Sequence, residues 1–348
     1  MARCLVRFVM LVTLAAGAVL PASSQTSSDL QSYFSKSIGL SQDQITAIRN
    51  GQPVAKLLTS RTPAEIYVFG AIYVNATPAS YGQFAYDFNR LSRQPGYLAV
   101  REFSSPPQLS DLNGFTLDSQ DIQSLKSCKP GNCQIQLPAN VMQQLHSSIN
   151  WSAANVNDQV NQFIQKLAVQ RLQLYQQQGN NILGAVYNDK KQPTTVAEQF
   201  KYILNYPEVL PQWAPDFYNY LLTYPGSRPA NVENMFYWDN VKFGLKPTLR
   251  MVHVVTMKGT GPSQPAYAIA EKQLYSSHYF ETALDLTFCV SGSGNPTQAG
   301  FYLIQVLGSE QAGLTGFKGS IVRKVAVGKA VSAEQTALTQ FKSALEHK

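Results

Sequence analysis

Histidine and carboxylate side chains are the residues whose types and spacing could carry chemistry in this sequence. His278 is followed closely by Glu281 and Asp285. An imidazole beside a carboxylate can form an acid/base pair or supply two metal ligands. Two such ligands outside a helix are not a recognised motif, however. A hydrolase or cyclase reaction at His278 with Glu281 or Asp285 is therefore an alternative interpretation, and we assign no catalytic residue and no metal ligand.

Sequence motifs for other kinds of catalysis are missing. The chain has no Gly-x-Ser-x-Gly nucleophile elbow, no P-loop and no dinucleotide-binding fingerprint. The glycines of Ser291–Asn295 indicate a turn, because no helix start follows that could bind a phosphate. We therefore expect no cofactor, and a non-catalytic protein is the favoured interpretation.

Aromatic residues are frequent, with 18 Tyr and 17 Phe, and several fall within the predicted strands after residue 232. Ordinary core packing explains such a group. The alternative is the lining of a hydrophobic binding site, with a few polar groups that orient the ligand. The candidate ligand-binding residues are Tyr237, Trp238, His253, Tyr267, Tyr275, His278, Asp285 and Phe341.

The N-terminus has the three parts of a secretory signal peptide. Arg3 and Arg7 precede the apolar stretch 8–20, and small residues at Ala22 and Ser24 fit a cleavage site. We predict that residues 1–24 are a signal peptide and that the protein is secreted or periplasmic. No other stretch is long and apolar enough for a membrane span, so none is expected after cleavage.

The charge and cysteine content agree with an exported protein. The formal net charge is +7, and no dense block of Lys and Arg alternates with aromatic residues, so we expect no nucleic acid partner. Cys128 and Cys133 enclose a Lys-Pro-Gly-Asn turn. In an oxidising compartment this pair is expected to form a disulfide. Cys289 lies within an apolar strand pattern and is expected to be a buried free thiol.

Hydrophobic periodicity predicts an α+β protein. Residues 25–62 form an N-terminal helical segment, 65–74 a strand buried on both faces, and 97–103 another strand. Residues 138–230 are helical and include one long amphipathic helix around 156–178. Six closely spaced strands follow at 234–243, 248–258, 266–275, 281–290, 300–307 and 319–328, which favours an antiparallel meander. Ser332 then begins a C-terminal helix with an apolar stripe.

This element order resembles the helix-grip domains of the START lipid-binding type. The resemblance covers residues 63–348, with 138–230 as a helical insertion that ordinary members lack. The strings Phe236–Trp238 and Gly313–Gly319 are similar to those of uncharacterised exported bacterial proteins. The resemblance implies an antiparallel sheet that grasps the C-terminal helix around an apolar cavity.

We therefore expect an exported, non-catalytic protein that binds a hydrophobic or lipid-like small molecule between the meander and residues 332–346. An alternative is an envelope protein that docks a partner through the helical insertion. That alternative predicts an exposed apolar patch on residues 138–230.

Overall fold

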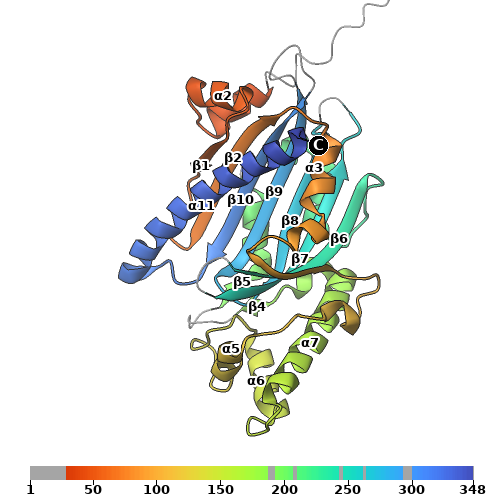
Figure 1. Cartoon of the computed structure of the whole chain (residues 1–348), viewed down its shortest axis with the longest axis vertical. Helices are drawn as coiled ribbons and strands as arrows, with labels where there is room; N and C mark the ends of the chain where they lie inside the picture. Colours follow the sequence, from red (N-terminus) through yellow and green to blue (C-terminus); the bar gives the residue numbers. More distant parts are fainter. Residues whose placement is uncertain are drawn as a thin grey trace, which may run out of the picture.

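A computed structural model describes residues 29–186, 193–206, 210–242, 246–261, 264–292 and 300–347. The fold is α+β and is built around an eight-stranded antiparallel sheet with the order β1-β2-β10-β9-β8-β7-β6-β3 (Figure 1). The strands of this sheet are β1 (Val54–Leu57), β2 (Glu65–Val74), β3 (Tyr97–Glu102), β6 (Val232–Lys242), β7 (Pro247–Lys258), β8 (Tyr267–Ser276), β9 (Phe280–Gly292) and β10 (Gly300–Gln311). A separate two-stranded sheet pairs β4 (Ala185–Val186) with β5 (Thr194–Thr195).

Helices cover both faces of the large sheet. They are η1 (Tyr33–Ser37), α2 (Gln42–Arg49), α3 (Pro78–Ala85), α4 (Phe88–Leu91), η2 (Leu109–Leu112), α5 (Ser119–Leu125), α6 (Ala139–Ser148), α7 (Val156–Gln178), η3 (Gly179–Ile182), α8 (Val196–Leu204), α9 (Leu210–Trp213), α10 (Pro215–Thr223) and α11 (Gly316–Glu346). In Figure 1, α11 and α3 cross the front of the sheet, whereas α5, α6 and α7 extend below it.

The two faces of the sheet pack against different parts of the chain. On the face toward α11 and α3, which we call the α11 face, Ile72 and Leu303 pack with Leu338. On the opposite face, which we call the α7 face, the strands pack against η1 and the helices between β3 and β6 in a larger apolar cluster. Because strand residues alternate between the faces, neighbouring residues such as Asp285 and Leu286 lie in different environments.

Several elements agree with the sequence pattern. Strand β2 has the predicted bounds, and every one of its residues is buried, as expected for a strand between two layers. The meander strands β6 to β10 and the long helix α7 are also confirmed. The N-terminal segment differs at its end, because Val54–Leu57 pairs with β2 as the edge strand β1.

The predicted strand at 319–328 is wrong, and so is the predicted helix start at Ser332. Residues 316–346 form one helix, α11. The β-branched residues Ile321, Val322 and Val325 suggested a strand, but these side chains are exposed. The side chains that pack on the sheet instead recur at helical spacing, as Ala326, Val327, Ala330 and Val331 show.

Cys128 and Cys133 form the predicted disulfide, and Cys289 is a buried free thiol. The predicted signal peptide, residues 1–24, lies outside the described residues. Within the described ranges, no helix combines the length and the hydropathy that crossing a bilayer requires.

Candidate functional site

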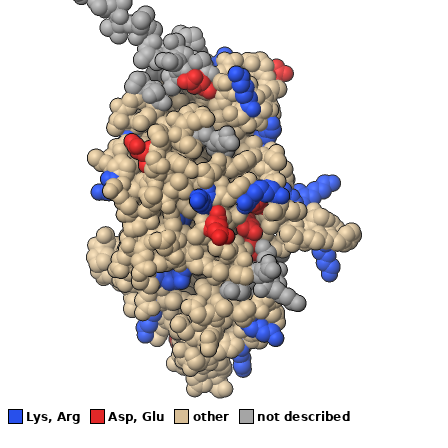
Figure 2. Space-filling view, turned by 180° about the vertical axis from the view of Figure 1, so that it is seen from behind, with Lys and Arg blue, Asp and Glu red and all other residues tan. Residues whose placement is uncertain are grey.

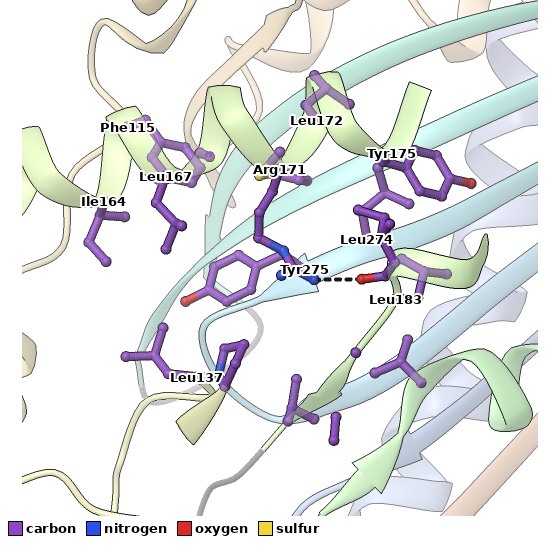
Figure 3. Close-up of a pocket in the computed structure, with 18 residues that line it drawn as sticks. Phe115, Leu137, Ile164, Leu167, Arg171, Leu172, Tyr175, Leu183, Leu274 and Tyr275 are labelled. Atoms are coloured by element: carbon purple, nitrogen blue, oxygen red, sulfur yellow. Dashed lines mark hydrogen bonds between the residues drawn. The ribbon is translucent and has the colours of Figure 1, made fainter. Parts of the chain in front are cut away.

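An apolar cavity lies on the α7 face, between α7 and the ends of β7 and β8. The space in it that a water-sized molecule can occupy measures about 70 Å³, whereas the whole recess, open solvent included, measures about 770 Å³. Figure 3 shows α7 along one side and Tyr275, Leu274 and Leu183 opposite it. The lining residues are Phe115, Leu137, Pro138, Ile164, Leu167, Ala168, Arg171, Leu172, Tyr175, Ile182, Leu183, Gly184, Ala185, Val186, Val196, Met251, Leu274 and Tyr275.

Helix α7 builds most of one wall because its apolar residues recur at helical spacing. Ile164, Ala168 and Leu172 are buried and follow one another at intervals of four positions, which places them on one side of the helix. The same stripe that identifies this helix in the sequence therefore faces the sheet and the cavity. Ligand sites are mostly apolar with few polar groups, and the lining of this recess has that character. Its volume of about 70 Å³ is smaller than the roughly 300–1,000 Å³ of drug-sized sites.

Arg171 is the one charged residue among the described residues that line the cavity. Its Nη2 atom donates a hydrogen bond to the carbonyl oxygen of Ile182, at 3.0 Å (Figure 3). Burial lowers the pKa of Arg171 below its ordinary value, and no acid in the described part of the chain opposes that effect. A guanidinium nevertheless stays charged in proteins. The cavity therefore contains a positive charge, and none of the described lining residues is a carboxylate partner for it.

Behind Tyr175 a chain of hydrogen bonds runs through the core. Lys272 Nζ donates to the Tyr175 hydroxyl at 3.1 Å, and that hydroxyl lies 3.0 Å from His253 Nδ1. His253 Nε2 lies 2.8 Å from Asn234 Oδ1, and the Asn234 amide donates to the Tyr220 hydroxyl. These partners assign the neutral histidine with its proton on Nε2. Burial, and secondarily the charge of Lys272, lowers the pKa of His253 well below its ordinary value, which agrees with this form.

Lys272 is buried with neutral partners. It is 1% exposed, it donates to Asn180 Oδ1 as well as to Tyr175, and its Nζ lies 3.7 Å from the ring centroid of Phe200. Burial lowers the pKa of this amine well below its ordinary value. Its amine is held by these hydrogen bonds and by the contact with the Phe200 ring. It adds a second basic group to the region behind the cavity.

His278 belongs to a different cluster. Its Nε2 lies 2.7 Å from Asp121 Oδ2, and its Nδ1 lies 3.0 Å from the carbonyl oxygen of Gln134. Lys246 donates to the other oxygen of Asp121 at 2.9 Å. Burial alone would raise the pKa of Asp121, but the hydrogen bonds from His278 and Lys246 outweigh it and lower the pKa. Both ring nitrogens of His278 therefore contact acceptors of the protein itself.

The α11 face of the sheet carries buried acids. Asp239, which is fully buried, accepts two hydrogen bonds from Arg250 at 2.9 and 2.5 Å. Glu271 accepts from the hydroxyls of Tyr86 and Tyr237, both at 3.0 Å. Burial, opposed by these hydrogen bonds, raises the pKa of Glu271.

Two further carboxyls share this face. Burial and the neighbouring Glu271 raise the pKa of Asp285 to about 7, and burial together with Asp285 raises the pKa of Glu334 to about 8. Glu334 lies directly over Gly70, where any Cβ would come within 1.9 Å of its carboxyl oxygen. Glycine at position 70 therefore makes room for the carboxyl group of α11.

The residues proposed from the sequence as ligand-binding do not form one site. Tyr275 lines the cavity, whereas Trp238 and His253 lie elsewhere on the α7 face, and the Trp238 ring donates to the carbonyl of Asp111. Tyr237, Tyr267 and Asp285 belong to the α11 face. Phe341 of α11 packs against Tyr81 and Phe84. The sequence led us to expect the cavity beside residues 332–346. The apolar cavity described here lies on the opposite face of the sheet instead.

The pairing expected for catalysis is also not the one that forms. His278 contacts Asp121, Glu281 accepts a hydrogen bond from Thr194, and Asp285 points to the opposite face of the sheet. Glu281 departs from strict alternation because β9 and β10 shift register between Glu310 and Gln311.

Sequence reasoning missed Arg171, Lys272 and Asp121. The sequence did contain a signal for two of them. Arg171 is a basic residue next to the apolar stripe of a long helix, and Lys272 is a basic residue in an apolar strand. No group of three or more His, Cys, Asp or Glu residues in the described ranges is arranged to hold a metal ion. The chain matches no family model, and no curated protein or solved structure matches it significantly. Its function is therefore inferred from the geometry of these residues.

Proposed function

We propose that this protein is an exported, non-catalytic binding protein for a hydrophobic or lipid-like small molecule, and that the cavity beside α7 is its binding site. The observation that carries the proposal is the apolar lining of that cavity, in which Arg171 is the single charged residue within the described ranges. An apolar ligand that enters it removes apolar surface from water, which is favourable by roughly 25 cal/mol for each Å² buried.

Export and the helix-grip arrangement belong to the same proposal. The disulfide between Cys128 and Cys133 supports export, because such bonds persist in oxidising compartments. The antiparallel sheet with a long C-terminal helix on one face supports a helix-grip relationship. In this proposal the helices between β3 and β6 add a second layer, and the binding site lies in that layer.

The catalytic alternative has less support. His278 has both ring nitrogens engaged, and so has His253. An imidazole needs a free nitrogen near the substrate to act as a general acid or base. The docking alternative also has little support, since Leu174 is the one large apolar residue of 138–230 that is exposed in the described ranges.

Two measurements test the proposal. Native mass spectrometry of the signal-processed protein, followed by solvent extraction, is expected to show a bound hydrophobic species. A titration with the neutral dye Nile red is expected to give saturable fluorescence that is lost in Ala168→Phe, which fills the cavity. Leu174→Phe adds a ring on the exposed side of the same helix and should bind the dye like the original protein. Equal binding by both variants would place the ligand elsewhere.

A further inference from the structure

We propose that the ligand of this cavity carries a carboxylate group and that Arg171 binds it. This inference rests on the proposed function and adds the chemical class of the ligand. The observation behind it is that the guanidinium of Arg171 lies among apolar side chains in the cavity.

The hydrogen bonds of Arg171 leave most of its donors available. A guanidinium has five N–H donors, and in the described residues Arg171 uses one for the carbonyl of Ile182. In Figure 3 the side chain leaves α7 and ends between Tyr275 and the segment that carries Leu183, inside the cavity. A group bound in the cavity is therefore within reach of the remaining donors.

The side chains around Arg171 favour an anion as the group that it binds. None of the described residues that line the cavity is acidic, and a charge removed from water without a partner is costly. A carboxylate fits the planar guanidinium with two parallel hydrogen bonds and neutralises its charge. The apolar walls and the small volume of about 70 Å³ suit a short hydrophobic chain end or ring, with the rest of the ligand outside the cavity.

The test compares decanoate with 1-decanol, which share a chain and differ in the head group, as displacers of Nile red. The original protein should bind decanoate at least tenfold more tightly, since a hydrogen bond to a charged group contributes about that factor. Arg171→Gln should remove this preference. Arg171→Lys keeps the positive charge but lacks the two parallel N–H donors of the guanidinium, and it should retain part of the preference. Lys166→Gln is the control, because it removes a positive charge from an exposed position of the same helix.

The outcomes separate this inference from the proposed function. If Arg171→Gln is folded by circular dichroism and still prefers decanoate, the head-group inference is wrong while the binding function stands. If decanol and decanoate bind the original protein equally, the inference is again wrong. If neither compound displaces the dye and the dye itself does not bind, the proposed function fails.

A different observation carries a second inference, at the N-terminal end of α11. Phe317 is 87% exposed, and Ile321, Val322 and Val325 are each more than half exposed. These are four of the eight exposed large apolar residues in the described ranges, and they lie within three turns of one helix. In Figure 1 this end of α11 projects beyond the edge of the sheet. Monomeric proteins rarely leave such side chains grouped and uncovered without a partner.

The charges around these side chains all have one sign. Residues 316–333 contain Lys318, Arg323, Lys324 and Lys329 and no acid. Arg323 is held by the carbonyls of Pro63 and Glu65, whereas Lys318, Lys324 and Lys329 have no resolved ion pair in the described residues. Figure 2 shows the end of this projection as tan atoms between blue side chains. Apolar and basic residues together on one exposed helix are typical of helices that lie on anionic membranes.

We infer that the first three turns of α11 seat the protein on an anionic lipid surface. Co-sedimentation with phosphatidylglycerol vesicles should exceed that with phosphatidylcholine vesicles and should decrease as salt increases. Phe317→Ser with Ile321→Ser should reduce binding at least tenfold, and Lys318→Glu with Lys324→Glu should do the same. The control is Leu109→Ser with Leu174→Ser, which removes exposed apolar residues elsewhere. Equal binding to both vesicles, or self-association that the serine variant abolishes without vesicle binding, would overturn the inference.

Discussion

On the α11 face of the sheet the buried ionisable groups are mainly acids, whereas beside the cavity on the α7 face they are bases. Asp239, Glu271 and Asp285 lie on the first face, with Arg250 paired to Asp239. Lys272, His253 and Arg171 lie on the other side, and their hydrogen-bond partners in the described residues are neutral groups. One layer of strands thus separates these acids from these three bases, although the buried acid Asp121 also lies on the α7 side, paired with His278 and Lys246.

The difference shows how the buried ionisable groups of each face are stabilised. The acids have donors, because tyrosine hydroxyls and one arginine point at them, and the carboxyls without such donors can become neutral by binding a proton. A lysine or histidine copes by losing a proton, but an arginine does not. Arg171 therefore remains charged, and this is the physical basis of the proposal that the cavity beside it binds an anionic ligand.

The largest effect is expected where a compensated charge loses its partner. Asp239→Ala would leave Arg250 buried without its carboxylate, and breaking a buried pair in this way costs about 3–5 kcal/mol. Urea unfolding measures the change. The control is Glu233→Ala on the same strand, which breaks an exposed pair with Lys258 and should cost less than about 1 kcal/mol. Equal costs for the two variants would show that burial of the pair has no energetic consequence.

The next effect concerns the pH dependence that Glu334 contributes. Its pKa in the folded state, about 8, lies above the ordinary value. The folded protein therefore binds more protons than the unfolded chain, so this stabilisation is present at low pH and is lost as pH rises toward 8. Glu334→Gln should make the decline between pH 5 and pH 8 shallower by on the order of 3 kcal/mol.

Chemical unfolding at several pH values checks this, and the control is Glu198→Gln, because that carboxylate is exposed on α8. A decline that is equally steep in Glu334→Gln and in the original protein would mean that this carboxyl is ionised in the folded state at neutral pH.

The opposite sign is expected for Lys272 on the α7 face. Burial lowers its pKa in the folded state, so above that pKa the unfolded chain binds the extra proton, and stability rises with pH toward the ordinary lysine pKa near 10.4. Lys272→Met should make the rise of stability with pH shallower below about pH 10. Lys201→Met, at an exposed position of α8, should leave the rise unchanged. Identical slopes in Lys272→Met and the original protein would contradict a neutral amine.

Local sequence patterns predicted much of the scaffold. The run of β-branched and aromatic residues in β2, the helical spacing in α7 and the turn between Cys128 and Cys133 each depend on neighbouring residues, and each is confirmed. In α11 the same kind of reasoning was wrong. Its β-branched residues resemble a strand, and the helical periodicity appears only when the side chains that pack on the sheet are known.

The partners of the site residues could not be predicted in this way. Lys272 meets Tyr175, and His278 meets Asp121, across more than 90 residues of sequence. Alternation along a strand indicates which side chains share a face, but it does not say which helix covers that face. For this reason the sequence led us to expect the cavity beneath α11, whereas the cavity described above lies beneath α7.

The smallest expected change in stability comes from removing one of the two tyrosine hydroxyls that donate to Glu271. Tyr86→Phe removes one of the two hydroxyls that donate to Glu271, and a single hydrogen bond of this kind contributes about 1 kcal/mol. Because that hydroxyl stabilises the carboxylate form, its loss should raise the pKa of Glu271 further. The loss of stability caused by Tyr86→Phe should consequently be greater at pH 8, where ionisation of Glu271 is more favourable, than at pH 5.

A double-mutant cycle with Glu271→Gln checks this prediction by urea unfolding at both pH values. With an uncharged amide in place of the acid, the cost of Tyr86→Phe should become independent of pH. Tyr237→Phe is the matched comparison, since its hydroxyl donates to Glu271 over the same distance of 3.0 Å. A pH-dependent cost that persists without the carboxyl group would trace the effect to Asp285 or Glu334, and would show that the acids of this face titrate as one coupled group.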